Sequence, residues 1–335
     1  MEYDTLGKTG LKVSRLGFGG IPIQRIDAEG TKRLMHRLLD AGVNYIDTAR
    51  GYTVSEEYLG YGLEGIREHF ILATKGRGWT KAEMEENVKI SLKNFRTDYI
   101  DLYQFHNPSL RDLETITAPG GALEALEEAK AAGKIRHIGI TAHSTEVFEK
   151  ALELPWVETV MFPYNIVENQ GEALIKRCKE KNVGFICMKP LAGGAIEDAT
   201  LALRYIVQNP CVSVVIPGMA EPRELEENLA AVCDTSPLSQ EEQQKIQAVR
   251  KQLGTQFCRR CNYCAPCTVG IQIPQVFVLE GYLTRYGLGD WAKGRYADMN
   301  AKASDCIQCG ACESRCPYHL PIRNMLAQVA KKFEK

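Results

Sequence analysis

Residues 121–141, GALEALEEAKAAGKIRHIGIT, contain a transition from helix to strand. The first part repeats alanine and leucine at helical spacing and reaches Gly133 and Lys134, which are typical of a helix stop. The second part, IRHIGIT from Ile135, is a short apolar run typical of a buried strand. Similar runs alternate with helical patterns, such as AEMEENVKISLKNF at 82–95, through the first two-thirds of the chain. This alternation predicts a parallel sheet with crossover helices.

Eight strand candidates follow one another in this way. They are RLGFGG from Arg15, VNYIDTA from Val43, FILATK from Phe70, YIDLYQFH from Tyr99, IRHIGIT from Ile135, VETVMFPYN from Val157, VGFICMKP from Val183 and VSVVIPG from Val212. Eight such units over about 230 residues have the size of a closed eight-stranded barrel. An open doubly wound sheet is the alternative, but it predicts a glycine-rich phosphate loop whose spacing GFGGIP lacks. We therefore predict an α/β fold, a (β/α)8 TIM barrel, followed by a C-terminal and mainly helical domain.

The predicted domains are a barrel at 1–237, a helical connector at 238–254 and a cysteine-rich domain at 255–335. Two short strands around a turn, within EYDTLGKTGLKVSRL, are expected before the first barrel unit, and Ser239 is the expected N-cap of the connector helix. A formal net charge of −1 gives no reason to expect a nucleic-acid or membrane partner. Neither a membrane-length apolar run nor a secretion signal is recognisable, so the cytoplasm is the expected location.

Eight of the 12 cysteines lie between Cys258 and Cys316. The second run, CIQCGACESRCP from Cys306, has the spacing C-x2-C-x2-C-x3-C-P, and the first, CRRCNYCAPC, has C-x2-C-x2-C-x2-C. These runs resemble bacterial-type ferredoxin domains, although the first is one residue shorter and has Thr268 where proline is usual. The scattered cysteines are expected to be small buried hydrophobic residues: Cys178, Cys187, Cys211 and Cys233.

The ferredoxin resemblance implies that the mainly helical C-terminal domain at 255–335 is an iron–sulfur domain with two [4Fe-4S] clusters. In such domains the fourth cysteine of each run ligates the cluster of the other run. Under this hypothesis one cluster is held by Cys258, Cys261, Cys264 and Cys316. The other is held by Cys306, Cys309, Cys312 and Cys267. The alternative is structural zinc, which usually takes two separated CxxC pairs, and cysteine triplets at x2 spacing fit one tetrahedral ion poorly.

Three consecutive strand candidates end in ionisable residues: Asp47, Lys75 and His106. Catalytic groups of such barrels lie at the carboxyl ends of the strands, so the three side chains are expected to meet there. The segment NPSLRDLETITAPGG after His106 is expected to be a loop that contributes to a substrate pocket.

The same residues carry a second resemblance. IDTARGYTVSEEYLG at 46–60 resembles the D-T-A-x-x-Y-x-x-S-E segment of aldo-keto reductases, and ATK, DLYQFHNP and IPGMAEPRELEENL resemble later landmarks of that family. The resemblance covers about residues 1–235 and implies a (β/α)8 barrel that reduces or oxidises a small carbonyl or alcohol with NADP or NAD. It implies a catalytic tetrad of Asp47, Tyr52, Lys75 and His106. Lys75 would lower the pKa of the Tyr52 phenol, which is otherwise about 10, and His106 would bind the carbonyl oxygen.

The cofactor residues depart from the family pattern. Met188 stands where the family often has a tyrosine for stacking, and Glu224 stands where a 2′-phosphate would be bound by members that prefer NADPH. The residues expected to bind the nicotinamide cofactor are His143, Ser144, Met188, Pro217, Gly218, Arg223, Glu227 and Asn228, the last two at its adenine end.

Three functions remain open from the sequence. The first is an aldo-keto reductase-type oxidoreductase of a small aldehyde or ketone, whose clusters exchange electrons with a ferredoxin-type partner. The second is a conventional NAD(P)H carbonyl reductase with structural clusters, and the third is a redox-sensing binding protein. No convincing flavin signature is present, although a flavin normally couples hydride to one-electron transfer. Seven basic residues are either a docking face or ordinary solubilising charges: Arg259, Arg260, Arg285, Lys293, Arg295, Arg315 and Arg323.

Overall fold

The computed structural model describes residues 1–254 and 256–334, which form two compact units. Unit 1 contains Met1–Asn165, Asn169–Pro190 and Asp198–Leu238. Unit 2 contains Ser239–Lys335 together with the short segments Ile166–Glu168 and Leu191–Glu197. Thr255 and Lys335, the predicted bounds of the iron–sulfur domain, both lie outside the described residues. Each unit is described below by itself.

Unit 1 contains an eight-stranded parallel sheet in the order β10-β9-β8-β7-β6-β5-β4-β3. Its strands are β3 (Phe18–Gly19), β4 (Tyr45–Asp47), β5 (Ile71–Gly76), β6 (Ile100–His106), β7 (Ile135–Thr141), β8 (Thr159–Pro163), β9 (Gly184–Met188) and β10 (Val214–Val215). The two edges meet, because Gly17 N donates to Val215 O at 2.8 Å and Val215 N donates to Arg15 O at 2.9 Å. Seven strands fall within the predicted runs, and β5 extends one residue beyond FILATK to Gly76, so the predicted barrel is confirmed.

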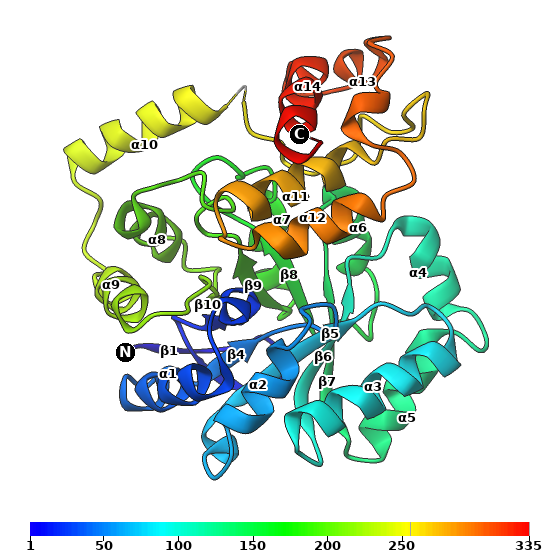
Figure 1. Cartoon of the computed structure of the whole chain (residues 1–335). Coiled ribbons are helices and arrows are strands. Elements are labelled where there is room, and N and C mark those ends of the chain that lie inside the picture. Colours follow the sequence, from blue (N-terminus) through cyan, green and yellow to red (C-terminus); the bar gives the residue numbers. More distant parts are fainter. Residues whose placement is uncertain (255, 335) are drawn as a thin grey trace. The chain divides into compact units, whose positions relative to one another are not determined.

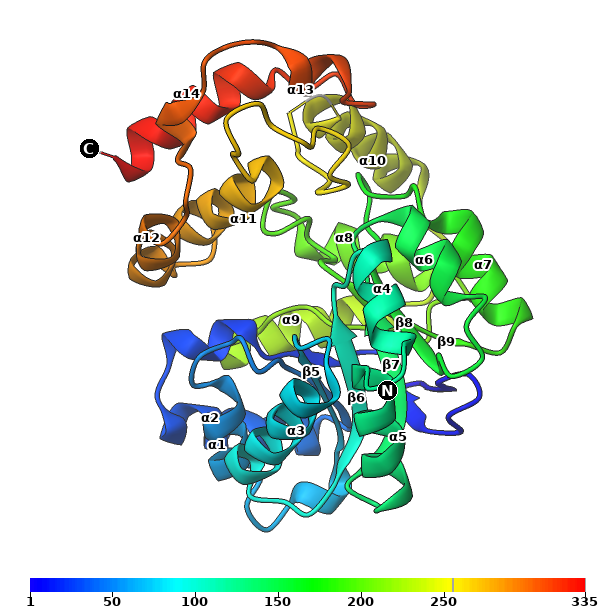
Figure 2. The same cartoon turned by 90° about the vertical axis from the view of Figure 1, so that its right-hand side faces the viewer.

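Helices follow the strands and lie outside the sheet (Figure 1, Figure 2). They are α1 (Ala28–Asp40), α2 (Ser55–Gly62), α3 (Lys81–Phe95), α4 (Leu110–Thr117), α5 (Ala122–Ala131), α6 (Thr145–Ala151), α7 (Glu172–Glu180), α8 (Ala199–Val207) and α9 (Pro222–Cys233), with short 3-10 turns η1 (Ile21–Arg25) and η2 (Arg67–His69). Helix α4 corrects the expectation of a plain loop after His106. Ser109 and Asp112 form a capping box there, so the polar residues at its start stabilise a helix.

Alternation along the strands divides the barrel interior into layers. An apolar layer is formed by the buried side chains of Tyr45, Ala73, Leu102, Met161, Ile186 and Val214, and the antiparallel hairpin of β1 (Tyr3–Thr5) and β2 (Lys12–Ser14) adds Leu6 and Val13. Side chains two residues apart on a strand point to the same face. Asp47, Lys75 and Gln104, two residues after Tyr45, Ala73 and Leu102, are therefore placed in the next layer toward the carboxyl ends of the strands.

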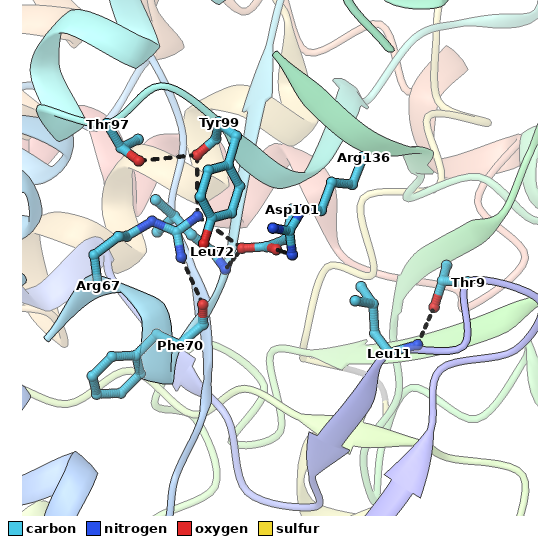
Figure 3. Close-up of polar contacts among 9 residues, drawn as sticks. All are labelled: Thr9, Leu11, Arg67, Phe70, Leu72, Thr97, Tyr99, Asp101 and Arg136. Carbon is cyan, nitrogen blue, oxygen red and sulfur yellow. Dashed lines mark hydrogen bonds and ion pairs between the residues drawn. The ribbon is translucent and has the colours of Figure 1, made fainter. Parts of the chain in front are cut away.

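A separate buried carboxylate lies at the beginning of β6 (Figure 3). Asp101 accepts hydrogen bonds from Arg67 Nη2 at 2.8 Å, from Leu72 N at 2.9 Å and from Arg136 Nη1 at 3.0 Å. Both guanidinium groups also lie over the ring of Tyr99. This network joins β5, β6 and β7 at the end of the barrel where conserved groups usually serve stability rather than catalysis.

Unit 2 is mainly helical and has its own apolar core. Its elements are α10 (Gln240–Leu253), α11 (Ile273–Thr284), α12 (Gly289–Ala297), η3 (Ala303–Asp305), α13 (Ala311–Ser314) and α14 (Ile322–Phe333). Ser239 is the N-cap of α10 and forms a capping box with Glu242, as predicted. The core contains Val276, Leu279 and Leu326 beside three cysteines, Cys264, Cys312 and Cys316. Across residues 1–254 and 256–334, no helix is both long and apolar enough to cross a membrane.

Candidate functional site

A buried ion pair lies at the carboxyl ends of β4 and β5. The Lys75 ammonium contacts Asp47 Oδ1 and donates to Thr48 O at 2.7 Å. Only 3% of Asp47 and 2% of Lys75 is exposed. Burial raises the pKa of Asp47 and lowers that of Lys75, while the attraction between the two charges opposes both shifts. Asp47 therefore holds Lys75 in one position and favours its charged form.

Tyr52 and His106 lie beside this pair. The Lys75 Nζ atom is 5.3 Å from the centre of the Tyr52 ring. The rings of Tyr52 and His106 meet edge to face, with their centres 6.1 Å apart. Both are half-buried, unlike the ion pair beside them. The structure thus brings all four residues of the expected tetrad together, with the two aromatic groups nearer to solvent.

The segment that carries Tyr52 is held in place by hydrogen bonds of two residues that follow it, Ser55 and Glu56. Ser55 Oγ donates to Gly20 O at 2.9 Å and lies 2.7 Å from Thr48 Oγ1. The buried carboxylate of Glu56 accepts hydrogen bonds from Thr74 Oγ1 and Ser91 Oγ, both at 2.8 Å. Thr74 precedes Lys75 on β5, so Glu56 links the segment after β4 to the strand that carries the lysine.

Gln104 is a site residue that the sequence reasoning missed. Its Nε2 atom donates to Asp47 Oδ2 at 3.1 Å, and the side chain is fully buried. It leaves Asp47 with one oxygen toward Lys75 and the other toward an amide. Alternation could have revealed it, because Gln104 is two residues before His106 and so shares its face of β6.

The residues expected to bind the nicotinamide cofactor follow three strands, β7, β9 and β10, and also lie on helix α9. Met188 ends β9 and is half-buried beside the interior apolar layer. His143 and Ser144 follow β7, and Ser144 caps α6 by accepting from Glu146 N at 3.2 Å. Pro217 O accepts from Gly19 N at 2.9 Å just after β10. At Gly218 a Cβ atom would lie 2.5 Å from Pro22 Cγ, so a larger residue would push η1 away.

The start of α9 carries the charges expected near the adenosine end of the cofactor. Glu224 accepts from Ala220 N at 2.6 Å, and it forms an ion pair with Arg25 at 3.2 Å. Arg223 is mostly exposed and donates to Glu227 at 2.6 Å, while Asn228 is buried. The charge of Glu224 is therefore partly balanced by Arg25. The sequence pattern gave no reason to expect Arg25 at this site.

In unit 2 the eight clustered cysteines line two hollows. The cysteines that line the first hollow are Cys267, Cys306, Cys309 and Cys312, called here the Cys309 group. The cysteines that line the second hollow are Cys258, Cys261, Cys264 and Cys316, called here the Cys261 group. Each hollow takes three cysteines from one run and the fourth from the other run. These are the two sets of four that the ferredoxin resemblance implied.

The donor spacing distinguishes a cluster from a single ion. Within the described part of the chain, no three Cys, His, Asp or Glu side chains are arranged to hold one metal ion. With Zn–S bonds of about 2.3 Å, one zinc ion requires sulfur atoms only about 3.8 Å apart. A cube of iron and sulfide is larger and takes four thiolates around a hollow, and the two cysteine groups fit that arrangement.

Burial disfavours the charged form of two of the thiols. Burial raises the pKa of Cys258 to about 11 and that of Cys264 to about 12. Near pH 7 such thiols ionise only when a bound metal supplies charge, so metal binding would release protons. Of the four scattered cysteines, Cys178 and Cys187 are buried as expected and Cys211 is only half-buried. The expectation was wrong for Cys233, which is exposed because it ends the surface helix α9.

Most of the basic residues that the sequence offered as a docking face or as solubilising charges make contacts within unit 2. Arg259 is 9% exposed and lies over the Tyr318 ring, and the Arg260 guanidinium pairs with Glu168. Arg315 donates to the carbonyl oxygens of Cys264 and Pro266. Arg323 pairs with Glu313 at 2.8 Å, and Arg285 with Glu280 at 3.3 Å. Five of the seven therefore have roles in holding unit 2 together, which hydrophobic patterning alone does not reveal.

Comparison with known proteins covers both units. The family model described as "Aldo/keto reductase family" matches residues 15–200 and 196–251. The model described as "4Fe-4S dicluster domain" matches residues 257–321.

Individual relatives match the larger part of the chain. It is 29% identical over 297 residues to L-galactose dehydrogenase of Arabidopsis thaliana, which covers 72% of this chain and 92% of that protein. It is 32% identical over 225 residues to aldo-keto reductase YhdN of Bacillus subtilis, which covers 60% of this chain and 66% of that protein. Among solved structures, aldo-keto reductase AKR11C1 from Bacillus halodurans in its holo form has a TM-score of 0.65 and 31% identity, covering 74% of this chain and 96% of that one.

Proposed function

Since the chain belongs to the aldo/keto reductase family and carries a 4Fe-4S dicluster domain, we propose that it interconverts a small carbonyl compound and its alcohol with NADP or NAD. Its two [4Fe-4S] clusters then exchange electrons with a ferredoxin-type partner. The family makes the protein an oxidoreductase. The substrate, the nicotinamide and the partner are the parts of the function proposed here.

One observation carries the carbonyl chemistry. The phenol ring of Tyr52 lies next to a buried lysine whose position is set by Asp47 and by Thr48 O. A nearby ammonium favours the phenolate, which lowers the pKa of a tyrosine toward the range where it can give up a proton near pH 7. This arrangement supports Tyr52 as the general acid for reduction and the general base for oxidation.

The reaction then divides among the residues at the mouth of the barrel. A bound nicotinamide supplies the hydride that reaches the carbonyl carbon. The Tyr52 hydroxyl donates its proton to the carbonyl oxygen, and Lys75 stabilises the phenolate that remains. His106, in contact with the Tyr52 ring, is placed to hydrogen-bond the same oxygen as negative charge develops there.

The cysteine hollows support the second half of the proposal. Four cysteines around each hollow match the ligand number of a [4Fe-4S] cluster. The Cys261 group and the Cys309 group would each hold one. A cluster passes one electron at a time, which is the chemistry of exchange with a ferredoxin-type protein.

A second function is favoured by a different observation. Cys264, Cys312 and Cys316 belong to the apolar core of unit 2, so clusters bound there would also hold that unit together. In this alternative the clusters are structural, and the barrel acts alone as an NAD(P)H-dependent carbonyl reductase.

The test uses the full chain, purified and reconstituted with iron and sulfide without oxygen. It is assayed with a panel of aldehydes and ketones and with both NADH and NADPH, and cluster reduction by reduced ferredoxin is followed by visible absorbance. Turnover together with ferredoxin-dependent bleaching is expected. Turnover with clusters that no ferredoxin reduces favours the structural alternative, and no turnover with any pair would contradict the carbonyl chemistry.

A further inference from the structure

The two cysteine groups of unit 2 have different surroundings. In the Cys309 group, Cys309 itself is exposed and Cys306 and Cys267 are half-buried. Apolar side chains line both hollows, but the Cys261 group has two buried cysteines and no exposed one, whereas only Cys312 is buried in the Cys309 group. Two clusters bound in these hollows would therefore not be equivalent.

The two hollows also differ in the residue that follows the fourth cysteine of each run. Pro317 follows Cys316 and lines the hollow of the Cys261 group. At the corresponding place of the first run, Thr268 follows Cys267 and lines the hollow of the Cys309 group. Proline has no hydrogen-bond donor, whereas threonine carries a hydroxyl. The internal repeat thus places a donor at one hollow and none at the matching position of the other.

The hydroxyl of Thr268 reaches a sulfur atom. Its Oγ1 atom is 3.5 Å from Cys309 Sγ, and the Gln308 amide nitrogen is 3.7 Å from Cys306 Sγ. A cysteine that ligates iron is a thiolate and has no proton, so in the loaded protein the hydroxyl must be the donor. Both contacts are made to cysteines of the same group.

We propose that Thr268 tunes the cluster held by the Cys309 group and makes it the more easily reduced of the two clusters. A reduced cluster carries one more negative charge, which a donor to its thiolate and nearby water both stabilise. The reduction potential of this cluster is therefore raised relative to that of its neighbour. An electron delivered to unit 2 then resides mainly on the more exposed cluster. The inference rests on the proposed pair of [4Fe-4S] clusters and assigns them unequal potentials.

The experiment is a redox titration of the reconstituted full chain, without oxygen and monitored by electron paramagnetic resonance. It compares the wild type with Thr268→Val, which removes the hydroxyl at nearly constant shape, and with Thr268→Ser, which keeps it. Thr284→Val is the matched control, because its hydroxyl bonds to Glu280 O in the same unit. We expect two midpoints, of which Thr268→Val shifts the higher one to a more negative value. Thr268→Ser and Thr284→Val should stay close to the wild type.

The outcomes separate this inference from the proposed function. If both clusters titrate but Thr268→Val leaves the higher midpoint in place, or shifts only the lower one, the role of Thr268 is wrong while the pair of clusters stands. If the same shift occurs in Thr284→Val, it is not caused by the contact with Cys309. An iron content near four per chain, or no reducible cluster, would instead overturn the pair of clusters and the inference with it.

Discussion

At the scale of single residues, the buried pair of Asp47 and Lys75 is the most sensitive point of the barrel. Removing one partner of a buried ion pair leaves the other charge without compensation, which costs about 3–5 kcal/mol. Asp47→Asn should therefore lower the free energy of unfolding by about this amount, as measured by chemical denaturation.

The double variant Asp47→Asn/Lys75→Met is the control for this prediction. It removes both charges, so it should be more stable than Asp47→Asn alone, although neither variant should catalyse. Equal stability of the single and double variants would show that Lys75 is not left as an unpaired buried charge.

The site residues differ in how far the sequence alone predicts them. Asp47, Lys75 and His106 end consecutive strands, so strand alternation and the barrel rule place them together. Tyr52 lies in an irregular segment between β4 and α2, where no periodicity determines side-chain direction, and only the family resemblance pointed to it. Gln104 is harder to predict, because an uncharged amide inside a strand run gives no signal until its position two residues before His106 is considered.

At the scale of elements, Glu158 connects α5, β7 and β8 and gives the barrel a specific dependence on acid. Its carboxylate contacts Lys130 Nζ and His137 Nδ1, both at 2.7 Å, and accepts from Ile138 N at 2.9 Å. Burial alone would raise the pKa of Glu158. The three partners outweigh that effect and hold the pKa at about 2.

The sign of the resulting pH dependence follows. The folded pKa is below the usual value of about 4.3, so this group stabilises the fold above that pH and stops doing so as pH falls toward 2. We expect the difference in unfolding free energy between wild type and Glu158→Gln to be largest at pH 6 and to shrink steadily toward pH 3. Urea denaturation at each pH measures it, and a difference that does not change with pH would contradict the assignment.

Helix capping explains which elements were predictable. Regular patterns identified α3 and α5, and Ser239 correctly marked the start of α10. Helix α4 was missed, although Ser109 and Asp112 form the same kind of capping box. It lies between two prolines, Pro108 and Pro119. Prolines this close together favour the prediction of a loop when no tertiary contacts are known.

At the scale of the whole molecule, the two units have separate cores and should respond differently to loss of iron. The core of unit 2 includes cysteines around two hollows, and its helix α13 is only four residues long. Empty hollows destabilise a core, and buried metal sites commonly couple binding to folding. Chelation of iron should therefore expose residues 239–334 to a protease while a fragment containing unit 1 persists.

Limited proteolysis followed by mass spectrometry measures this response, with untreated holoprotein as the control. Unit 2 that stays resistant after complete iron loss would mean that its apolar core suffices without clusters.

The sequence could predict that two such domains exist, because cysteine spacing and strand alternation are both local patterns. It could not predict the arginine contacts inside unit 2, which depend on residues far apart in the chain, such as Arg260 and Glu168.

The most direct test of the account compares carbonyl reduction by the reconstituted wild type with that by Tyr52→Phe, using the best aldehyde and nicotinamide from the panel. Tyr58→Phe, a half-buried tyrosine on the following helix, is the matched control. We expect Tyr52→Phe to lose at least about 100-fold in turnover, the usual contribution of general acid catalysis, with iron content unchanged and Tyr58→Phe active. Undiminished turnover by Tyr52→Phe would contradict the assignment of this phenol as the proton donor of the barrel.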